Sequence, residues 1–272
     1  MRVAIFGCGW LGRALAKKLQ HEHTVFAAVR SEASLQKLLE EHLYAFQNPD
    51  KNSEFWRAEV LVVSISPRHN YLETLTKLPH FLGADLKQII LLSSTSVYAA
   101  AEGVVDETSP VKSESIAAQG ETLFQKQFPQ GTILRLGGLM GDDRVAGQWP
   151  SKAVQDSAVN YLHQVDAVGI IEQLIEQNIQ GEIINAVAPN HPKRAAVYEM
   201  NAEAFGFGLP RFEEAKERVV SSEKSRSVLG YDYRFDDPMQ FWSGSRDGCC
   251  QKEGQAAKLM TTEAVMIHER NK

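Results

Sequence analysis

Cysteine is scarce in this chain, and the few cysteines form no recognisable pattern. Of the three, Cys8 lies in a glycine-rich segment, while Cys249 and Cys250 are adjacent near the C-terminus. This arrangement offers neither a disulfide framework nor the paired spacing of structural zinc ligands. The sequence therefore excludes a small disulfide-stabilised fold, and we expect no metal site.

Long apolar runs are also missing. A helix needs about 20 apolar residues to cross a bilayer, whereas the densest apolar stretches here are short ones such as 59–65 and 88–92. The apolar start of the chain reaches Gly7 too soon for the core of a signal peptide. We therefore expect a cytoplasmic protein with no membrane partner.

An excess of positive charge is the third absence. The 29 Lys and Arg residues are outnumbered by 34 Asp and Glu residues, which leaves a net charge of -5. Proteins that bind nucleic acid rely on a basic surface to hold the phosphate backbone. We therefore expect no nucleic-acid partner but a small-molecule substrate, and the sequence leaves open a monomer or a homodimer.

The chain does contain a regular alternation of predicted strands and helices. Short β-branched or aromatic runs predict strands, and apolar residues at helical spacing predict helices between them. The expected strands are 2–6, 23–29, 44–47, 59–65, 88–93, 131–136 and 181–186, and the expected helices are 10–20, 31–41, 70–81, 115–127 and 167–177. This alternation predicts an α/β fold, a Rossmann-type doubly wound parallel sheet with a smaller C-terminal substrate lobe.

The pattern also suggests how the chain is divided. Residues 1–140 carry most of the alternation and form the expected dinucleotide-binding domain. Residues 141–242 form the expected substrate lobe, with some return to the sheet. Residues 243–272 change in composition and have few apolar anchors, so we expect a poorly anchored tail there.

A glycine motif follows the first predicted strand. Residues 7–12 read Gly-Cys-Gly-Trp-Leu-Gly, which matches G-x-G-x-x-G between a strand and a helix. The first glycine permits a tight turn, the second lets the backbone approach a pyrophosphate, and the third lets the helix pack on the strand. The predicted cofactor contacts are Gly7, Gly9, Trp10, Leu11 and Gly12. Ser64, in the expected strand 59–65, is a further predicted contact.

The end of the second predicted strand indicates which dinucleotide binds. An Asp or Glu at this point would read the ribose 2′-hydroxyl of NAD, but the chain has Arg30 followed by Ser31. An arginine fork suits a 2′-phosphate, so the pair favours NADP, with NAD still possible. The alternative is that Arg30 is only a solvated charge at a strand end.

Two segments carry a resemblance to a known family. Residues 89–98 read Ile-Ile-Leu-Leu-Ser-Ser-Thr-Ser-Val-Tyr and continue to Val-Asp-Glu-Thr-Ser-Pro at 105–110. They resemble the extended short-chain dehydrogenases/reductases, the NAD-dependent epimerase/dehydratase superfamily. The resemblance implies that Ser94 donates a hydrogen bond to the reacting carbonyl, with Tyr98 as a second candidate catalytic residue and Ser96 beside the substrate.

The resemblance extends over about residues 1–240. Residues 133–141 are similar to the family's strand and substrate-loop segment, and 159–166 are similar to its later Val-Asn-x-x-His-x-x-Asp segment. The layout resembles most closely the YeeZ-like branch, which is counted among the atypical members. Arg135 and Arg144 flank the variable loop and suit an anionic substrate, and His163 is a further candidate substrate contact. The structural alternatives are an ion pair for Arg135 and a helix N-cap for Asp166.

One family motif is missing. Typical members carry Tyr-x-x-x-Lys on the helix after the catalytic strand, whereas Ile116 and Gly120 stand where the pair is expected. The sequence therefore supports two hypotheses. The first is an NADP-dependent oxidoreductase or epimerase acting on a small carbonyl or sugar-type substrate. The second is a non-catalytic NADP(H)-binding or redox-sensing protein.

Overall fold

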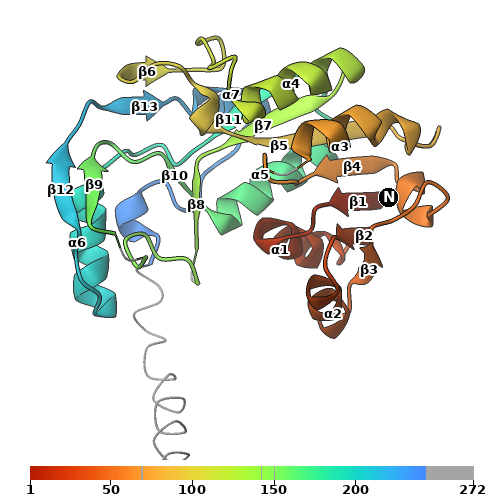
Figure 1. Ribbon diagram of the computed structural model, residues 1–272, viewed down its shortest axis with the longest axis horizontal. Coiled ribbons are helices and arrows are strands. Elements are labelled where there is room, and N and C mark those ends of the chain that lie inside the picture. Colours follow the sequence, from red (N-terminus) through yellow and green to blue (C-terminus); the bar gives the residue numbers. More distant parts are fainter. Residues whose placement is uncertain (69, 142, 150, 243–272) are drawn as a thin grey trace, which may run out of the picture.

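A seven-stranded parallel sheet forms the centre of the computed structural model, which describes residues 1–68, 70–141, 143–149 and 151–242 (Figure 1). From one edge to the other its strands are β3 (Tyr44–Gln47), β2 (Thr24–Val29), β1 (Arg2–Phe6), β4 (Val60–Val63), β5 (Gln88–Ser94), β7 (Thr132–Leu136) and β11 (Ile183–Ala186). This order confirms the predicted doubly wound sheet. The expected tail, 243–272, lies outside the described residues.

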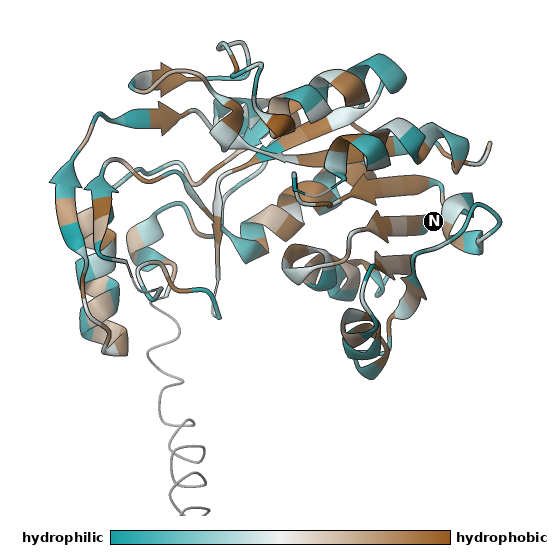
Figure 2. Cartoon of the chain, viewed as in Figure 1, coloured by the Kyte–Doolittle hydropathy of each residue, from teal (hydrophilic) through white to brown (hydrophobic). Residues whose placement is uncertain are grey.

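Helices cover both faces of the sheet. One face packs against α1 (Trp10–Leu19), α2 (Glu32–Glu40), α5 (Gln164–Glu176) and α7 (Glu223–Leu229). The other packs against α3 (Tyr71–Lys77), α4 (Ile116–Gln127) and the 3₁₀ turns η1 (Glu54–Arg57) and η2 (Leu78–His80). In Figure 2 the strands between these layers are the most hydrophobic part of the molecule.

Two-sided coverage explains the composition of the strands. Alternate residues of a strand point to opposite faces, so a strand covered on both sides must be apolar throughout. Strand β4 reads Val-Leu-Val-Val and is buried along its whole length. Its Leu61 and Val62 belong to the two different hydrophobic clusters on either side of the sheet.

The second lobe is built from short pieces. Three pairs of parallel strands join β8 with β10, β9 with β12 and β6 with β13. Their bounds, with those of the remaining helices, are β6 (Gly103–Val105), β8 (Gly138–Met140), β9 (Ala153–Asp156), β10 (Tyr161–His163), β12 (Arg211–Glu214), β13 (Arg218–Val220), α6 (Arg194–Phe205) and η4 (Pro238–Gln240). A small cluster that includes Val197, Phe241 and Trp242 holds this lobe together.

The residues after 140 also return to the main sheet. Strand β11 pairs with β7, and helix α5 packs beside α1. The interval 141–242 therefore supplies both the second lobe and one edge of the sheet. Helix α6 was not predicted, because only Val197 and Asn201 of its residues are buried and it carries no apolar stripe. Within the described residues, we find no helix with the length and hydropathy to cross a membrane.

Candidate functional site

The chain order of the sheet creates a switch point between β1 and β4. The chain runs from β1 outward to β2 and β3, then crosses back to β4 on the other side of β1. Ligands of doubly wound sheets bind outside the carboxyl ends of the strands at such a point. The glycine motif lies there at the end of β1, and Ser64 lies there at the end of β4.

Gly7 makes the turn out of β1. Its backbone is left-handed, with φ of +91°, and an added Cβ would lie 2.7 Å from the carbonyl oxygen of Ser64. The amide of Ser64 in turn donates to the carbonyl of Phe6 at 2.8 Å. Only glycine combines this backbone with such a close approach. Ser64 is thus fixed beside the glycine turn, where the sequence placed it.

Gly9 begins helix α1 and leaves space in front of it. An added Cβ there would come no closer than 3.9 Å to any other group, and its φ of -84° is open to all residues. The first amide with a helical partner is that of Arg13, which donates to Gly9 at 2.9 Å. The earlier first-turn amides, of Trp10, Leu11 and Gly12, therefore have no carbonyl within the helix to bond.

Gly12 and Cys8 pack the loop against the sheet. A Cβ on Gly12 would lie 3.2 Å from the side chain of Ile5 and 3.4 Å from the sulfur of Cys8. Burial raises the pKa of the Cys8 thiol to about 12, so this group stays neutral at physiological pH. Its role is packing behind the loop.

Arg30 and Ser31 lie at the end of β2 as expected. Arg30 is exposed, and its carbonyl accepts hydrogen bonds from the side chains of Gln47 and Asn48. Ser31 caps helix α2, because its hydroxyl oxygen accepts from the amide of Ser34 at 3.2 Å. The hydroxyl also donates to the Ser34 hydroxyl at 2.8 Å. Ser31 thus orients the helix next to Arg30.

The serines at the end of β5 face in different directions. The hydroxyl of Ser93 donates to Glu121 on α4 at 2.6 Å. Ser94 follows on the opposite face of the strand, half-buried, and its hydroxyl oxygen accepts from the amide of Ser96 at 3.2 Å. This contact caps the 3₁₀ turn η3 (Thr95–Val97), and Ser96 itself is exposed. Ser94 is thus at the carboxyl edge, as its predicted role requires.

Tyr98 and Arg135 lie in a buried network, which corrects the expected catalytic role of Tyr98 and the expected substrate contact of Arg135. Arg135 donates three hydrogen bonds to the carboxylate of Glu121, the shortest of 2.7 Å, and both side chains are 4% exposed. Arg135 also donates to the hydroxyl oxygen of Tyr98 at 3.1 Å. The Tyr98 hydroxyl in turn donates to the side-chain oxygen of Asn185 at 2.6 Å. These groups join α4, β7, β11 and the turn after β5 and do not face the cleft.

The electrostatics of this network are consistent with a structural role. Burial by itself would lower the pKa of Arg135, but its hydrogen bonds to Glu121 and the charge of that carboxylate raise the pKa above its usual value. Burial raises the pKa of Tyr98 despite the opposing effect of Arg135. The Tyr98 phenol is therefore neutral at physiological pH and does not transfer a proton readily.

His163 is also buried, which corrects its expected contact with substrate. Only 2% of the residue is exposed. Its Nδ1 accepts from the amide of Val165 at 3.3 Å and so caps helix α5. Its ring lies against Phe235 with centroids 3.9 Å apart. The helix cap considered for Asp166 is thus made by His163, while the Asp166 carboxylate accepts from the amides of Arg234 and Phe235.

Arg144 has a partner that the sequence did not indicate. Its guanidinium carbon lies 4.1 Å from the ring centroid of Trp10. The indole Nε1 of Trp10 donates to both carboxylate oxygens of Asp143, at 2.9 and 3.0 Å. Trp10 thus connects the glycine motif with the loop after β8. Residues 133 positions apart meet here, and no local spacing could have predicted it.

Helix α4 provides no acid or base at the two positions where the family pair was expected. Ile116 is 48% exposed. Gly120 lies against the ring of Tyr71, where an added Cβ would be 2.3 Å from the nearest ring carbon. The close contact between α3 and α4 therefore occupies the place of a functional side chain.

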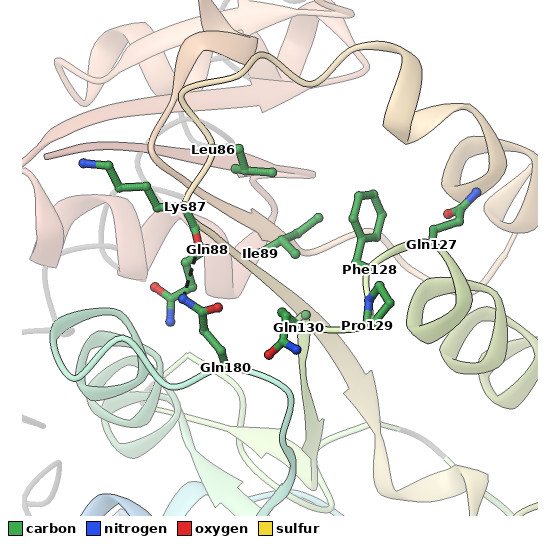
Figure 3. Close-up of a pocket in the computed structure, with 10 residues that line it drawn as sticks. Leu86, Lys87, Gln88, Ile89, Gln127, Phe128, Pro129, Gln130 and Gln180 are labelled. Carbon is green, nitrogen blue, oxygen red and sulfur yellow. Dashed lines mark hydrogen bonds between the residues drawn. The ribbon is translucent and has the colours of Figure 1, made fainter.

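A cavity of about 260 Å³ lies at the amino ends of the strands, on the side of the sheet away from the glycine motif (Figure 3). It is bordered by residues that precede β7 and β11 and by the start of β5, so it is at the amino ends of these parallel strands. Its lining residues are Leu86, Lys87, Gln88, Ile89, Gln127, Phe128, Pro129, Gln130, Gly131 and Gln180. This cavity is separate from the glycine motif and from Ser94.

Comparisons with known proteins agree with this architecture. Residues 2–96 match the family described as NADP oxidoreductase, coenzyme F420-dependent. Protein YeeZ of Escherichia coli strain K12 is 29% identical over 270 residues, which cover 88% of this chain and 97% of the relative. The chain is thus similar to Protein YeeZ over most of its length, and its residues 2–96 are similar to the NADP oxidoreductase family.

Solved structures show the same fold over nearly the whole chain. UDP-glucuronic acid 4-epimerase from Bacillus cereus, in complex with NAD, matches with a TM-score of 0.71 at 17% identity and covers 89% of this chain and 97% of its own. A short-chain dehydrogenase/reductase superfamily protein from Agrobacterium tumefaciens, with bound NAD, matches with a TM-score of 0.70 at 15% identity and covers 94% and 100%. The fold is therefore that of the NAD-dependent epimerases and short-chain dehydrogenases/reductases.

The buried ion pair leads to a prediction about stability. Glu121→Gln keeps the shape of the side chain but leaves the Arg135 cation buried without its carboxylate. Breaking such a pair typically costs about 3–5 kcal/mol. We expect a loss of this order in the free energy of unfolding, measured by urea titration. Glu73→Gln, which breaks an exposed pair with Lys77, should leave the free energy of unfolding nearly unchanged, because solvent screens exposed pairs. Equal losses in the two variants would contradict a structural role for Glu121.

Proposed function

We propose that this protein binds NADP(H) at the glycine motif and acts as an atypical oxidoreductase or epimerase on a small carbonyl or sugar-type substrate. The observation that carries the proposal is the open space before helix α1. An added Cβ on Gly9 meets no group closer than 3.9 Å. The first-turn amides of the helix border this space, and such a helix end favours an anion. A pyrophosphate fits this arrangement.

The choice of NADP depends on the end of β2. The exposed Arg30 stands at this end, and the adjacent Ser31 is the cap of α2. A guanidinium donates paired hydrogen bonds to a phosphate, whereas the 2′-hydroxyl of NAD calls for an acidic acceptor. The two solved relatives hold NAD, so this preference is proposed for the present chain on its own residues.

Chemistry at the substrate rests on Ser94. A bound nicotinamide would supply or accept hydride at a carbon of the substrate. Ser94 is half-buried at the carboxyl edge of β5, and its hydroxyl hydrogen is available because its oxygen accepts the bond from Ser96. It can therefore donate to a carbonyl or alkoxide oxygen. Tyr98 is buried in its network, so another group must deliver the proton, and we expect turnover to be slow.

A second function has support from the same observations. Helix α4 has no Tyr and Lys at the expected positions, and Arg135 and His163 are engaged in the core. A protein that binds NADP(H) without turning over a substrate, as a redox sensor does, needs only the glycine motif and Arg30. Turnover separates the two functions, since both require the cofactor.

The cofactor site is tested by Gly9→Val. The space at Gly9 is open, but its ψ of -148° and its N-cap position are less favourable for Val than for Gly, so we expect a loss in the free energy of unfolding of about 1–2 kcal/mol with the fold retained. The new side chain would occupy the place of the pyrophosphate, and NADPH affinity should fall at least about tenfold in calorimetry. Gly208→Val is the control, because an added Cβ there also meets nothing within 4 Å. Unchanged NADPH affinity in Gly9→Val would remove the proposed site.

Cofactor preference is tested by Arg30→Ala. We expect the wild-type protein to bind NADPH more tightly than NADH, by about 10- to 100-fold for hydrogen bonds between a charged donor and a phosphate. Arg30→Ala should erase most of this difference and leave NADH affinity unchanged. Titrations of both dinucleotides measure it. A wild-type preference for NADH is the result that would refute the role of Arg30.

Catalysis is tested by following NADPH absorbance with a panel of aldehydes, ketones and nucleotide-sugars. Loss of one donor to a developing oxyanion costs about 10²-fold or more in rate where that donor is fully used. We expect Ser94→Ala to approach this loss, Ser94→Thr to retain part of the rate, and Ser227→Ala, on the exposed side of α7, to match the wild type. A fully active Ser94→Ala would exclude the catalytic role. Tight NADPH binding without turnover of any substrate would favour the second function.

A further inference from the structure

The loop after β8 places two charged side chains on the glycine motif. Asp143 accepts from the edge of the Trp10 indole, and the guanidinium of Arg144 lies over the face of the same ring. The backbone of this loop is closed by hydrogen bonds between Gly141 and Arg144 in both directions, at 2.9 and 3.2 Å. Both charges are therefore attached to the first residue of helix α1.

Further contacts fix this arrangement from the second lobe. The indole of Trp242 donates to the carbonyl of Gly141 at 3.0 Å. The side-chain amide of Gln164 donates to the carbonyl of Trp10 at 3.3 Å. An added Cβ on Gly141 would lie 3.1 Å from the Trp10 ring, so the loop backbone packs directly on the indole. The position of Arg144 is thus determined by packing and does not depend on a surface ion pair.

Arg144 brings a positive charge close to the N-terminus of helix α1. The N-terminus of a helix carries a partial positive charge, and side chains in the first turn lean toward it. Arg144 stacks on such a side chain and adds a full positive charge at the same end. Helix α1 has no acidic residue in its first turn. The neighbouring carboxylate, that of Asp143, accepts from the indole Nε1 of the same Trp10 ring.

A cation near a helix N-terminus adds to the attraction of that helix end for an anion. Amides of the first turn, the helix dipole and a guanidinium together form a site for an anion with several oxygens. We propose that Arg144 completes the pyrophosphate site of the glycine motif, and that Trp10 and Asp143 position it there. This inference rests on the proposed binding of NADP(H) and changes the expected role of Arg144 from a substrate contact to a cofactor contact.

The proposal separates two arginines by what they recognise. Arg30 is at the end of β2 and reads the 2′-phosphate, which NADPH has and NADH lacks. Arg144 is at the start of α1 and reads the pyrophosphate, which both dinucleotides contain. Arg144→Ala should therefore lower the affinity for NADPH and the affinity for NADH by the same factor, about tenfold for a lost hydrogen bond from a charged donor. Arg30→Ala should weaken NADPH alone.

A variant of Asp143 should change dinucleotide affinity in the opposite direction from Arg144→Ala. Asp143→Asn keeps an oxygen that can accept from the Trp10 indole but removes a negative charge that lies within screening distance of the pyrophosphate. We expect dinucleotide affinity to stay the same or to rise. Arg144→Lys keeps the charge without the planar guanidinium and should retain part of the affinity. Arg57→Ala is the matched control, because Arg57 is an exposed arginine that precedes β4 at the opposite edge of the sheet.

The experiment is isothermal titration of NADPH, NADH and ADP into the full chain and each variant, with circular dichroism melting as the check on folding. The proposal is supported if Arg144→Ala lowers the affinity for all three ligands equally, and by more than Arg57→Ala does. Weakening of NADPH alone, no change relative to Arg57→Ala, or an equal loss in Asp143→Asn would overturn it. A wild-type protein that binds none of the ligands would instead refute the proposed function.

Discussion

The close approach of the glycine turn to the end of β4 is the constraint on which the site depends. Gly7 has a left-handed backbone, and the carbonyl of Ser64 occupies the space that any side chain would need. This contact lets β1 and β4 lie side by side at the switch point while the chain turns into α1. The open space before Gly9 exists because the turn is this tight.

A second constraint is the buried pair of Glu121 and Arg135. A charge in the interior must keep its partner, because an isolated one loses its hydration without compensation. The pair therefore ties α4 to β7, and Tyr98 and Asn185 extend the connection to β11. The polar groups left at the carboxyl edge of β5 are small ones, chiefly Ser94 and Ser96.

The two lobes share a side chain at the cofactor loop. Trp10 belongs to the glycine motif by sequence, yet its ring is contacted by Gly141, Asp143 and Arg144 of the loop after β8. Residues 141–242 also supply α5 and β11 to the Rossmann core. The glycine motif and residues 141–242 are therefore joined by packed contacts.

The sequence by itself determined the central sheet, the glycine motif and the position of Ser94. Those features follow from local periodicity and from glycine and β-branched residues, whose effects act within a few neighbours. Only the tertiary structure showed the partners of Tyr98, Arg135, His163 and Arg144. Each is a polar residue whose partners lie far away in the chain, so burial and pairing, which local patterns do not encode, settle whether it faces the core or the cleft. Helix α6 and the paired short strands likewise depend on packing within the second lobe.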